Sequence, residues 1–140
     1  MNLELHLRIV GALLLFLFVL NLIVPFHFGW KQELKQVSLL TRNIFFVHSF
    51  FIAMSILAFA LLCLFFTYTL IEGSMLATLV LGFLTLFWAI RLYMQWFVYD
   101  ASLWRGHRFE TIVHFVFTVQ WAYFAAVYGV AFWRQVQYQA

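Results

Sequence analysis

The stretch IFFVHSFFIAMSILAFALLCLFFTYTLI, residues 44–71, contains no Asp, Glu, Lys or Arg. A transmembrane helix needs about 20 mostly apolar residues, so this stretch is long enough to cross a bilayer by itself. Three further stretches are comparably apolar, at about residues 9–28, 75–99 and 109–133. The sequence therefore predicts four membrane-spanning helices.

The composition of the whole chain indicates the same class. Of its 140 residues, 66% are hydrophobic and 9% are charged, whereas soluble proteins have about 45–50% apolar and about 25% charged residues. This balance excludes a disordered chain, a nucleic-acid-binding module and a secreted disulfide-rich scaffold. The single cysteine, Cys63, cannot form an internal disulfide, which excludes carriers and redox relays that need cysteine pairs. The lipid bilayer is the predicted partner, and nucleic acid is not.

The connections between the four stretches are short. Residues 72–74 and 100–108 link the second stretch to the third and the third to the fourth, and no internal repeat or linker divides the chain. We therefore predict an all-α fold for residues 1–140, one integral membrane domain built as a four-helix antiparallel bundle with short loops. The first stretch is expected to be retained, because no small-x-small cleavage site follows it as in a signal peptide.

The loop between the first two stretches is the only one with room for further structure. Its aliphatic residues fall on roughly one helical face among polar ones, which indicates an interfacial helix over residues 31–42. A plain solvated loop explains the same pattern equally well. Thr41 or Asn43 is expected to cap the second span.

The positive charges predict the orientation of the chain. Arg8 and Arg134 lie on one predicted side of the membrane. A larger set lies in the two longer loops on the other side: Lys31, Lys35, Arg42, Arg105 and Arg108. Cytoplasmic loops carry an excess of Lys and Arg, so both termini are expected outside the cytoplasm. The expected location is an integral position in a bacterial inner membrane.

Polar and ionisable residues inside a membrane are costly and therefore mark candidate sites. Six such residues gather in the predicted cytoplasmic half of the spans: His48, Arg91, Gln95, Tyr99, Glu110 and His114. Residues four apart share a helix face, which places Arg91, Gln95 and Tyr99 on one stripe. Glu110 and His114 share another. We predict an ion pair between Arg91 and Glu110, because no other acidic side chain lies in the spans at a similar depth.

Each of these residues also has a purely structural interpretation. Glu110 could simply respond to the dipole at the start of its helix. Arg91 could extend its side chain to the lipid headgroups. A single histidine such as His48 or His114 is usually a satisfied core residue. Gln95 and Tyr99 could serve only as hydrogen bonds between helices.

The first functional hypothesis is a cofactor site, which the residues favour slightly. His48 and His114 come from different spans at equal predicted depth, which suits axial ligation of haem or shared binding of a metal ion. Glu110 would be a third metal ligand or would orient a histidine. The cofactor-binding set is completed by Arg91, Gln95, Tyr99 and Arg105. A haem absorption band or stoichiometric metal would test this hypothesis.

The second hypothesis is an enzyme or binder that acts on a lipid headgroup or another amphiphile. Glu110 and His114 would be the catalytic pair, one as base and one as its orienting partner. Arg91, Arg105 and Arg108 would hold a phosphate. A third hypothesis is a non-catalytic accessory subunit, bound to another membrane protein or to a second copy. Whether the chain is an enzyme is left open by the sequence, and the charge-poor outer half argues against a channel.

Overall fold

The computed structural model describes residues 2–27, 29–100, 102 and 104–139, without the side chains of residues 26, 27, 31 and 33. The side chain of Lys31, counted above among the loop charges, is thus outside the described part. The structure divides into two compact units, residues 5–67 and residues 1–4 with 68–140. Each unit is considered by itself.

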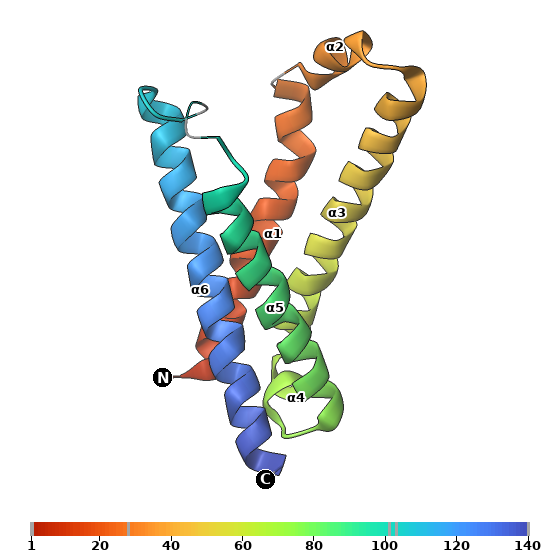
Figure 1. The fold of residues 1–140 in the computed structure, drawn as a ribbon. Coiled ribbons are helices and arrows are strands. Elements are labelled where there is room, and N and C mark those ends of the chain that lie inside the picture. The colour runs from red at the N-terminus through yellow and green to blue at the C-terminus, as the bar shows by residue number, and fades with distance from the viewer. Residues whose placement is uncertain (1, 28, 101, 103, 140) are drawn as a thin grey trace. The chain divides into compact units, whose positions relative to one another are not determined.

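Helices make up all of the regular structure in the described residues (Figure 1). In chain order they are α1 (Leu3–His27), α2 (Trp30–Glu33), the 3-10 helix η1 (Leu34–Gln36), α3 (Leu39–Phe65), α4 (Thr67–Ile71), α5 (Met75–Phe97) and α6 (Arg108–Gln139). Four of them, α1, α3, α5 and α6, are long and apolar enough to cross a membrane. The predicted all-α bundle class is confirmed, and the chain is an integral membrane protein by the length and composition of these helices.

The helices extend further than their apolar stretches. α1 begins at Leu3 rather than near residue 9, and α6 continues to Gln139 rather than ending near residue 133. Hydropathy marks only the apolar window, whereas Glu, Arg and Gln are good helix formers and continue the helix beyond it. The second predicted span also differs, because α3 ends at Phe65 and the short α4 follows.

The first long loop contains two short helical turns, α2 and η1, instead of one helix over residues 31–42. Ser38 caps α3, and its Oγ accepts a hydrogen bond from the backbone N–H of Thr41 at 3.2 Å. The predicted cap at Thr41 or Asn43 is wrong, because both residues already lie inside α3. A serine outside the apolar stretch supplies the acceptor that the first turn of the helix requires.

In the unit of residues 5–67, α1 and α3 approach closely at Gly11. A Cβ atom at this position would lie 2.8 Å from Leu64 Cγ and 3.0 Å from Cys63 Cβ. Cys63 is fully buried, as is common for a free cysteine, which packs as a small hydrophobic residue. Only glycine leaves room for this approach, as is common where membrane helices pack closely.

In the other unit, α5 and α6 run antiparallel and side by side (Figure 1). Ser74 caps α5 by accepting a hydrogen bond from the N–H of Ala77 at 3.1 Å. The buried residues of the two helices are mostly apolar and include Leu81, Leu84, Trp88, Trp121, Phe124, Val127 and Ala131. This packing determines which polar side chains of α5 meet which of α6.

Candidate functional site

A buried glutamine joins α5 to α6. Gln95 is only 6% exposed, and its Oε1 accepts hydrogen bonds from Arg91 Nη1 and from Trp121 Nε1, each at 3.3 Å. Its Nε2 lies 2.9 Å from Nδ1 of His114, which is itself 9% exposed. One amide thus connects an arginine of its own helix with a tryptophan and a histidine of the next.

The partners determine how this amide and the imidazole are oriented. Guanidinium and indole N–H groups only donate hydrogen bonds, so the atom that faces Arg91 and Trp121 must be Oε1. Nε2 of Gln95 therefore faces His114 and donates to Nδ1. The neutral imidazole then carries its proton on Nε2.

This assignment makes a spectroscopic prediction. We expect ¹⁵N NMR of histidine-labelled protein, in a pH range where the rings are neutral, to show the Nε2–H tautomer for His114. His48 is a matched control, because its Nδ1 lies 2.8 Å from the carbonyl oxygen of Ile44, which only accepts. His48 should show Nδ1–H, and the same Nδ1–H form at His114 would contradict the assigned network.

Aromatic rings enclose the histidine. The Trp104 indole stacks on the His114 ring with centroids 4.4 Å apart and an interplanar angle of 8°, and Trp96 approaches edge-on at 6.4 Å. Trp104 lies in the loop before α6, where its carbonyl oxygen is 2.6 Å from the hydroxyl of Thr111. The guanidinium of Arg105 lies 5.5 Å above the Trp104 ring. The Trp104 ring of this loop thus covers one face of the His114 imidazole.

A second group of rings surrounds Arg91. Its guanidinium carbon lies 5.1 Å from the centroid of Trp121 and 5.6 Å from that of Tyr99. Trp121 stacks in turn on Trp88, with centroids 5.0 Å apart. Aromatic faces attract cations through their negative electrostatic potential. The Arg91 guanidinium therefore contacts the faces of Trp121 and Tyr99 and the amide oxygen of Gln95.

The predicted ion pair between Arg91 and Glu110 is wrong. Both side chains belong to the described part of the chain, and no salt bridge joins them. Gln95 is level with His114, so in antiparallel helices Arg91 is level with about residue 118. Glu110 lies about eight residues away from that level, or about 12 Å. The predicted span boundaries place both residues in one half of the membrane, although their levels differ by about two helical turns.

Glu110 occupies the first turn of α6 and is exposed. A carboxylate in this position is stabilised by the helix dipole. Although Glu110 and His114 are four residues apart, no hydrogen bond joins these two described side chains. The structure therefore does not form the catalytic pair predicted for them.

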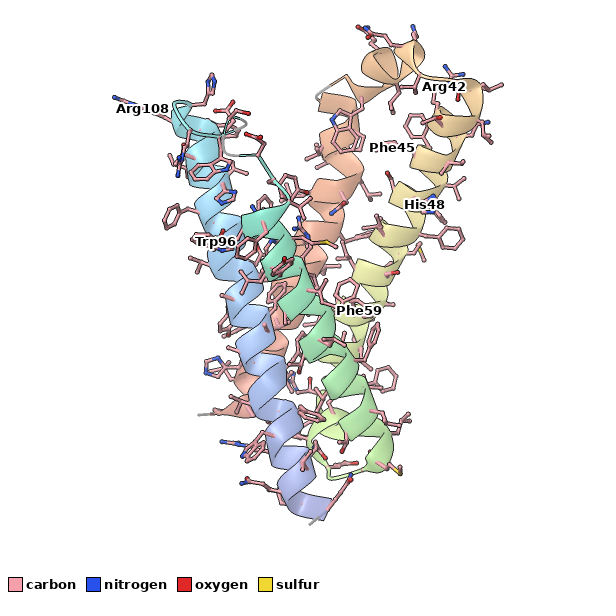
Figure 2. The ribbon with its side chains drawn as sticks, in the orientation of Figure 1. Arg42, Phe45, His48, Phe59, Trp96 and Arg108 are labelled. Carbon is pink, nitrogen blue, oxygen red and sulfur yellow. The ribbon has the colours of Figure 1, made fainter. Side chains whose placement is uncertain are left out.

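His48 lies on α3, in the unit of residues 5–67, and is labelled in Figure 2 together with Trp96 on α5. The side chain is exposed and bonds to the Ile44 carbonyl of its own helix. This local bond satisfies one ring nitrogen without a second helix. The remaining predicted residues, Tyr99 and Arg105, follow α5 and contribute through the ring contacts described above.

The hydrogen bonds of His114 also bear on the metal and haem hypothesis. A ligating histidine usually donates its other ring N–H to a partner, whereas Nδ1 of His114 accepts from Gln95. Ligation through Nε2 would require loss of the Nε2 proton or rotation of the Gln95 amide. In addition, no three His, Cys, Asp or Glu side chains among the described residues are placed to share a metal ion. The geometry therefore disfavours His114 as a metal or haem ligand.

The sequence interpretation missed the tryptophans. The six intramembrane candidates include no tryptophan, yet Trp88 is 2% exposed and Trp121 is 4% exposed. The spacing of the sequence indicates that these tryptophans belong to the interface. Trp88 and Gln95 are seven residues apart, as are His114 and Trp121. Residues seven apart lie on the same face of a helix. Two matched pairs on consecutive helices therefore indicated one shared interface.

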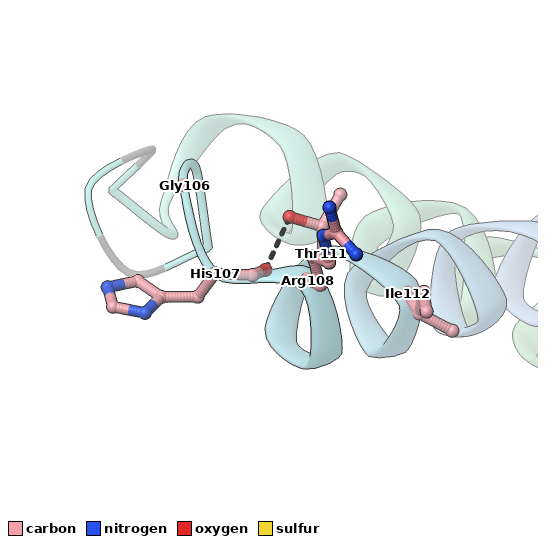
Figure 3. Close-up of a pocket in the computed structure, with 5 residues that line it drawn as sticks. All are labelled: Gly106, His107, Arg108, Thr111 and Ile112. Carbon is pink, nitrogen blue, oxygen red and sulfur yellow. Dashed lines mark hydrogen bonds between the residues drawn. The ribbon is translucent and has the colours of Figure 1, made fainter.

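The loop before α6 also borders an open cavity of about 380 Å³, shown in Figure 3. Gly106 lines it and has a positive φ of 90°, which lets the chain turn sharply into α6. Earlier in the loop, Asp100 Oδ1 accepts a hydrogen bond from the Ser102 N–H at 2.7 Å. This bond holds the pKa of the Asp100 carboxyl below its usual value. None of the six predicted intramembrane residues lines this cavity.

No family model, curated protein or solved structure matches this chain. Its function is therefore argued from the geometry of the site alone.

Proposed function

We propose that this membrane protein binds an anionic amphiphile at the donor cluster between α5 and α6. The donor cluster consists of Trp88, Arg91, Gln95, Trp104, His114 and Trp121. The proposal keeps the lipid-directed hypothesis and replaces the cofactor hypothesis. It involves binding without a catalytic step, and the bilayer is the only partner that it requires.

The observation that carries the proposal is a surplus of hydrogen-bond donors. Both lone-pair positions of Gln95 Oε1 are occupied by Arg91 and Trp121, and Nδ1 of His114 is occupied by Gln95. In contrast, Nε1 of Trp88 and Nε1 of Trp104 are enclosed and have no partner among the described residues. A ligand that completes this cluster must supply acceptor atoms.

Arg91 defines the charge of that ligand. It has five N–H groups, and a single hydrogen bond, to Gln95, uses one of them within the described structure. Its side chain is half-buried in an apolar span, where a cation without a counter-ion is costly. Phosphate and carboxylate groups match the planar guanidinium geometry well. We therefore infer an anionic headgroup, held by Arg91 and flanked by aromatic rings.

The positive-charge pattern complements this inference. Arg105 lies in the loop beside the cluster and Arg108 begins α6, and by the loop-charge rule this side would be cytoplasmic. The proposed ligand would thus enter from the cytoplasmic leaflet, and both termini would lie outside the cytoplasm. Anionic lipids are attracted to such basic segments.

The test is lipid retention measured by native mass spectrometry. Purified protein is titrated with phosphatidylglycerol, which is anionic, or phosphatidylcholine, which is zwitterionic. We expect Arg91→Gln to weaken phosphatidylglycerol binding about tenfold, equivalent to about 1.4 kcal/mol. Arg91→Lys should retain part of the binding, because it keeps the charge but loses the bidentate geometry.

Arg42→Gln is the matched control for charge. It removes one positive charge from the same predicted side of the membrane, at the start of α3 and outside the donor cluster. Equal phosphatidylglycerol binding by Arg91→Gln and Arg42→Gln would overturn the proposal. A melting curve for each variant verifies that the compared proteins are folded.

A further inference from the structure

A second cavity lies in the unit of residues 1–4 and 68–140, near the end of α6. Its volume is about 330 Å³, and its wall includes Leu3, Glu4, Ile71, Arg134, Gln135 and Tyr138. Gln135 follows His114 by 21 positions on the same helix, which is roughly 30 Å along the axis. This cavity is therefore separate from the donor cluster.

The wall of this cavity includes a buried glutamine, Gln135, whose amide oxygen has no hydrogen-bond donor in the described part of the chain. The residue is 1% exposed, and its Nε2 donates to the carbonyl oxygen of Leu70 at 2.8 Å. That carbonyl can only accept, so the orientation of the amide is determined. Its Oε1 is enclosed and has no partner within the described residues. An unpaired buried acceptor is unfavourable, and a ligand that donates an N–H would satisfy it.

The same wall carries both signs of charge. Glu4 provides a carboxylate and Arg134 a guanidinium. Leu3 and Ile71 add apolar surface. This combination fits an amphiphile whose headgroup contains a cation and an anion.

We propose that this cavity binds a phosphoethanolamine headgroup. The ammonium group donates to Gln135 Oε1 and faces the Glu4 carboxylate, and the phosphate is held by Arg134. The acyl chains then follow the apolar surface of the neighbouring helices. The donor cluster lacks acceptors and this cavity contains an unpaired one, so the two sites select headgroups of different chemistry.

The experiment compares two lipids that share a phosphate but differ in N–H groups. Phosphatidylethanolamine can donate to Gln135, whereas the trimethylated phosphatidylcholine cannot. In native mass spectrometry of the full chain, we expect about tenfold stronger retention of phosphatidylethanolamine. Gln135→Met should remove this preference. Arg134→Gln, at an exposed position, should weaken both lipids and leave phosphatidylglycerol binding dependent on Arg91.

Arg42→Gln is the control, because it removes one positive charge at the start of α3, outside the cavity. Competition with soluble phosphoethanolamine separates two sources of the ligand: displacement identifies the free headgroup as sufficient, and its absence assigns the site to the intact lipid. Equal retention of the two lipids by the unmodified protein would overturn the proposal. Equal effects of Arg134→Gln and Arg42→Gln would also overturn it, and this comparison does not depend on the folding of Gln135→Met.

Discussion

Replacement of Gln95 by leucine should strongly destabilise the protein. Leucine has a similar volume but cannot bond to Arg91, Trp121 or His114, which all meet the Gln95 amide. A buried polar group left without a partner costs about 1–3 kcal/mol, so we expect a loss of about 2–4 kcal/mol from the Trp121 and His114 groups together. The measurement is reversible unfolding of the purified protein in lipid–detergent bicelles, monitored by tryptophan fluorescence.

Gln120→Leu is the matched control on α6. The Nε2 of Gln120 is enclosed and already lacks a partner in the described part of the structure. Its replacement should therefore change the unfolding free energy by less than about 0.5 kcal/mol or increase it. Similar destabilisation by Gln95→Leu and Gln120→Leu would show that the Gln95 hydrogen bonds do not stabilise the packing of α5 against α6.

Substitution of Gly11 by alanine should also destabilise the protein, for a steric reason. The added Cβ would lie 2.8 Å from Leu64 Cγ and 3.0 Å from Cys63 Cβ, so α1 and α3 would have to separate. Overpacking of this kind costs about 1–3 kcal/mol. Alanine favours a helix over glycine by up to about 1 kcal/mol, which offsets only part of this cost. The same unfolding assay measures the net loss.

Gly129→Ala provides the matched control, because the same change meets Thr85 Cγ2 at an ordinary 3.6 Å. It should stabilise the protein by up to about 1 kcal/mol through helix propensity. In a double mutant, Leu64→Ala should relieve part of the Gly11→Ala penalty, because it removes the clashing Leu64 atoms and leaves only the contact with Cys63 Cβ. Additive losses would mean that the close approach of α1 and α3 does not cause the penalty.

The donor cluster shows how far helical spacing can predict a site. Arg91 and Gln95, four residues apart, were expected on one stripe of their helix, and they do bond to each other. His114 was expected at a similar depth on the next helix, and it bonds to Gln95. The choice of Glu110 as the partner of Arg91 failed, because it rested on depth within predicted span boundaries rather than on the register of α5 against α6, in which Gln95 faces His114.

The tryptophan of the loop could not be predicted by periodicity at all. Trp104 reaches His114 because the chain between α5 and α6 folds back and Thr111 binds the Trp104 carbonyl. Loop geometry of this kind depends on bonds between residues with no regular spacing. The sequence shows an interfacial tryptophan, which is a common feature of membrane proteins.

The sequence by itself determined the environment and the elements of this protein. Apolar stretches long enough to span a bilayer must form helices there, because the membrane interior offers no water to bond the backbone. The tertiary structure alone decided which polar groups meet. That outcome depends on the register of α5 against α6, which the packing of Trp88 on Trp121 and the fold of the intervening loop determine together. The result is an amide with every acceptor position occupied, beside an arginine with N–H groups to spare.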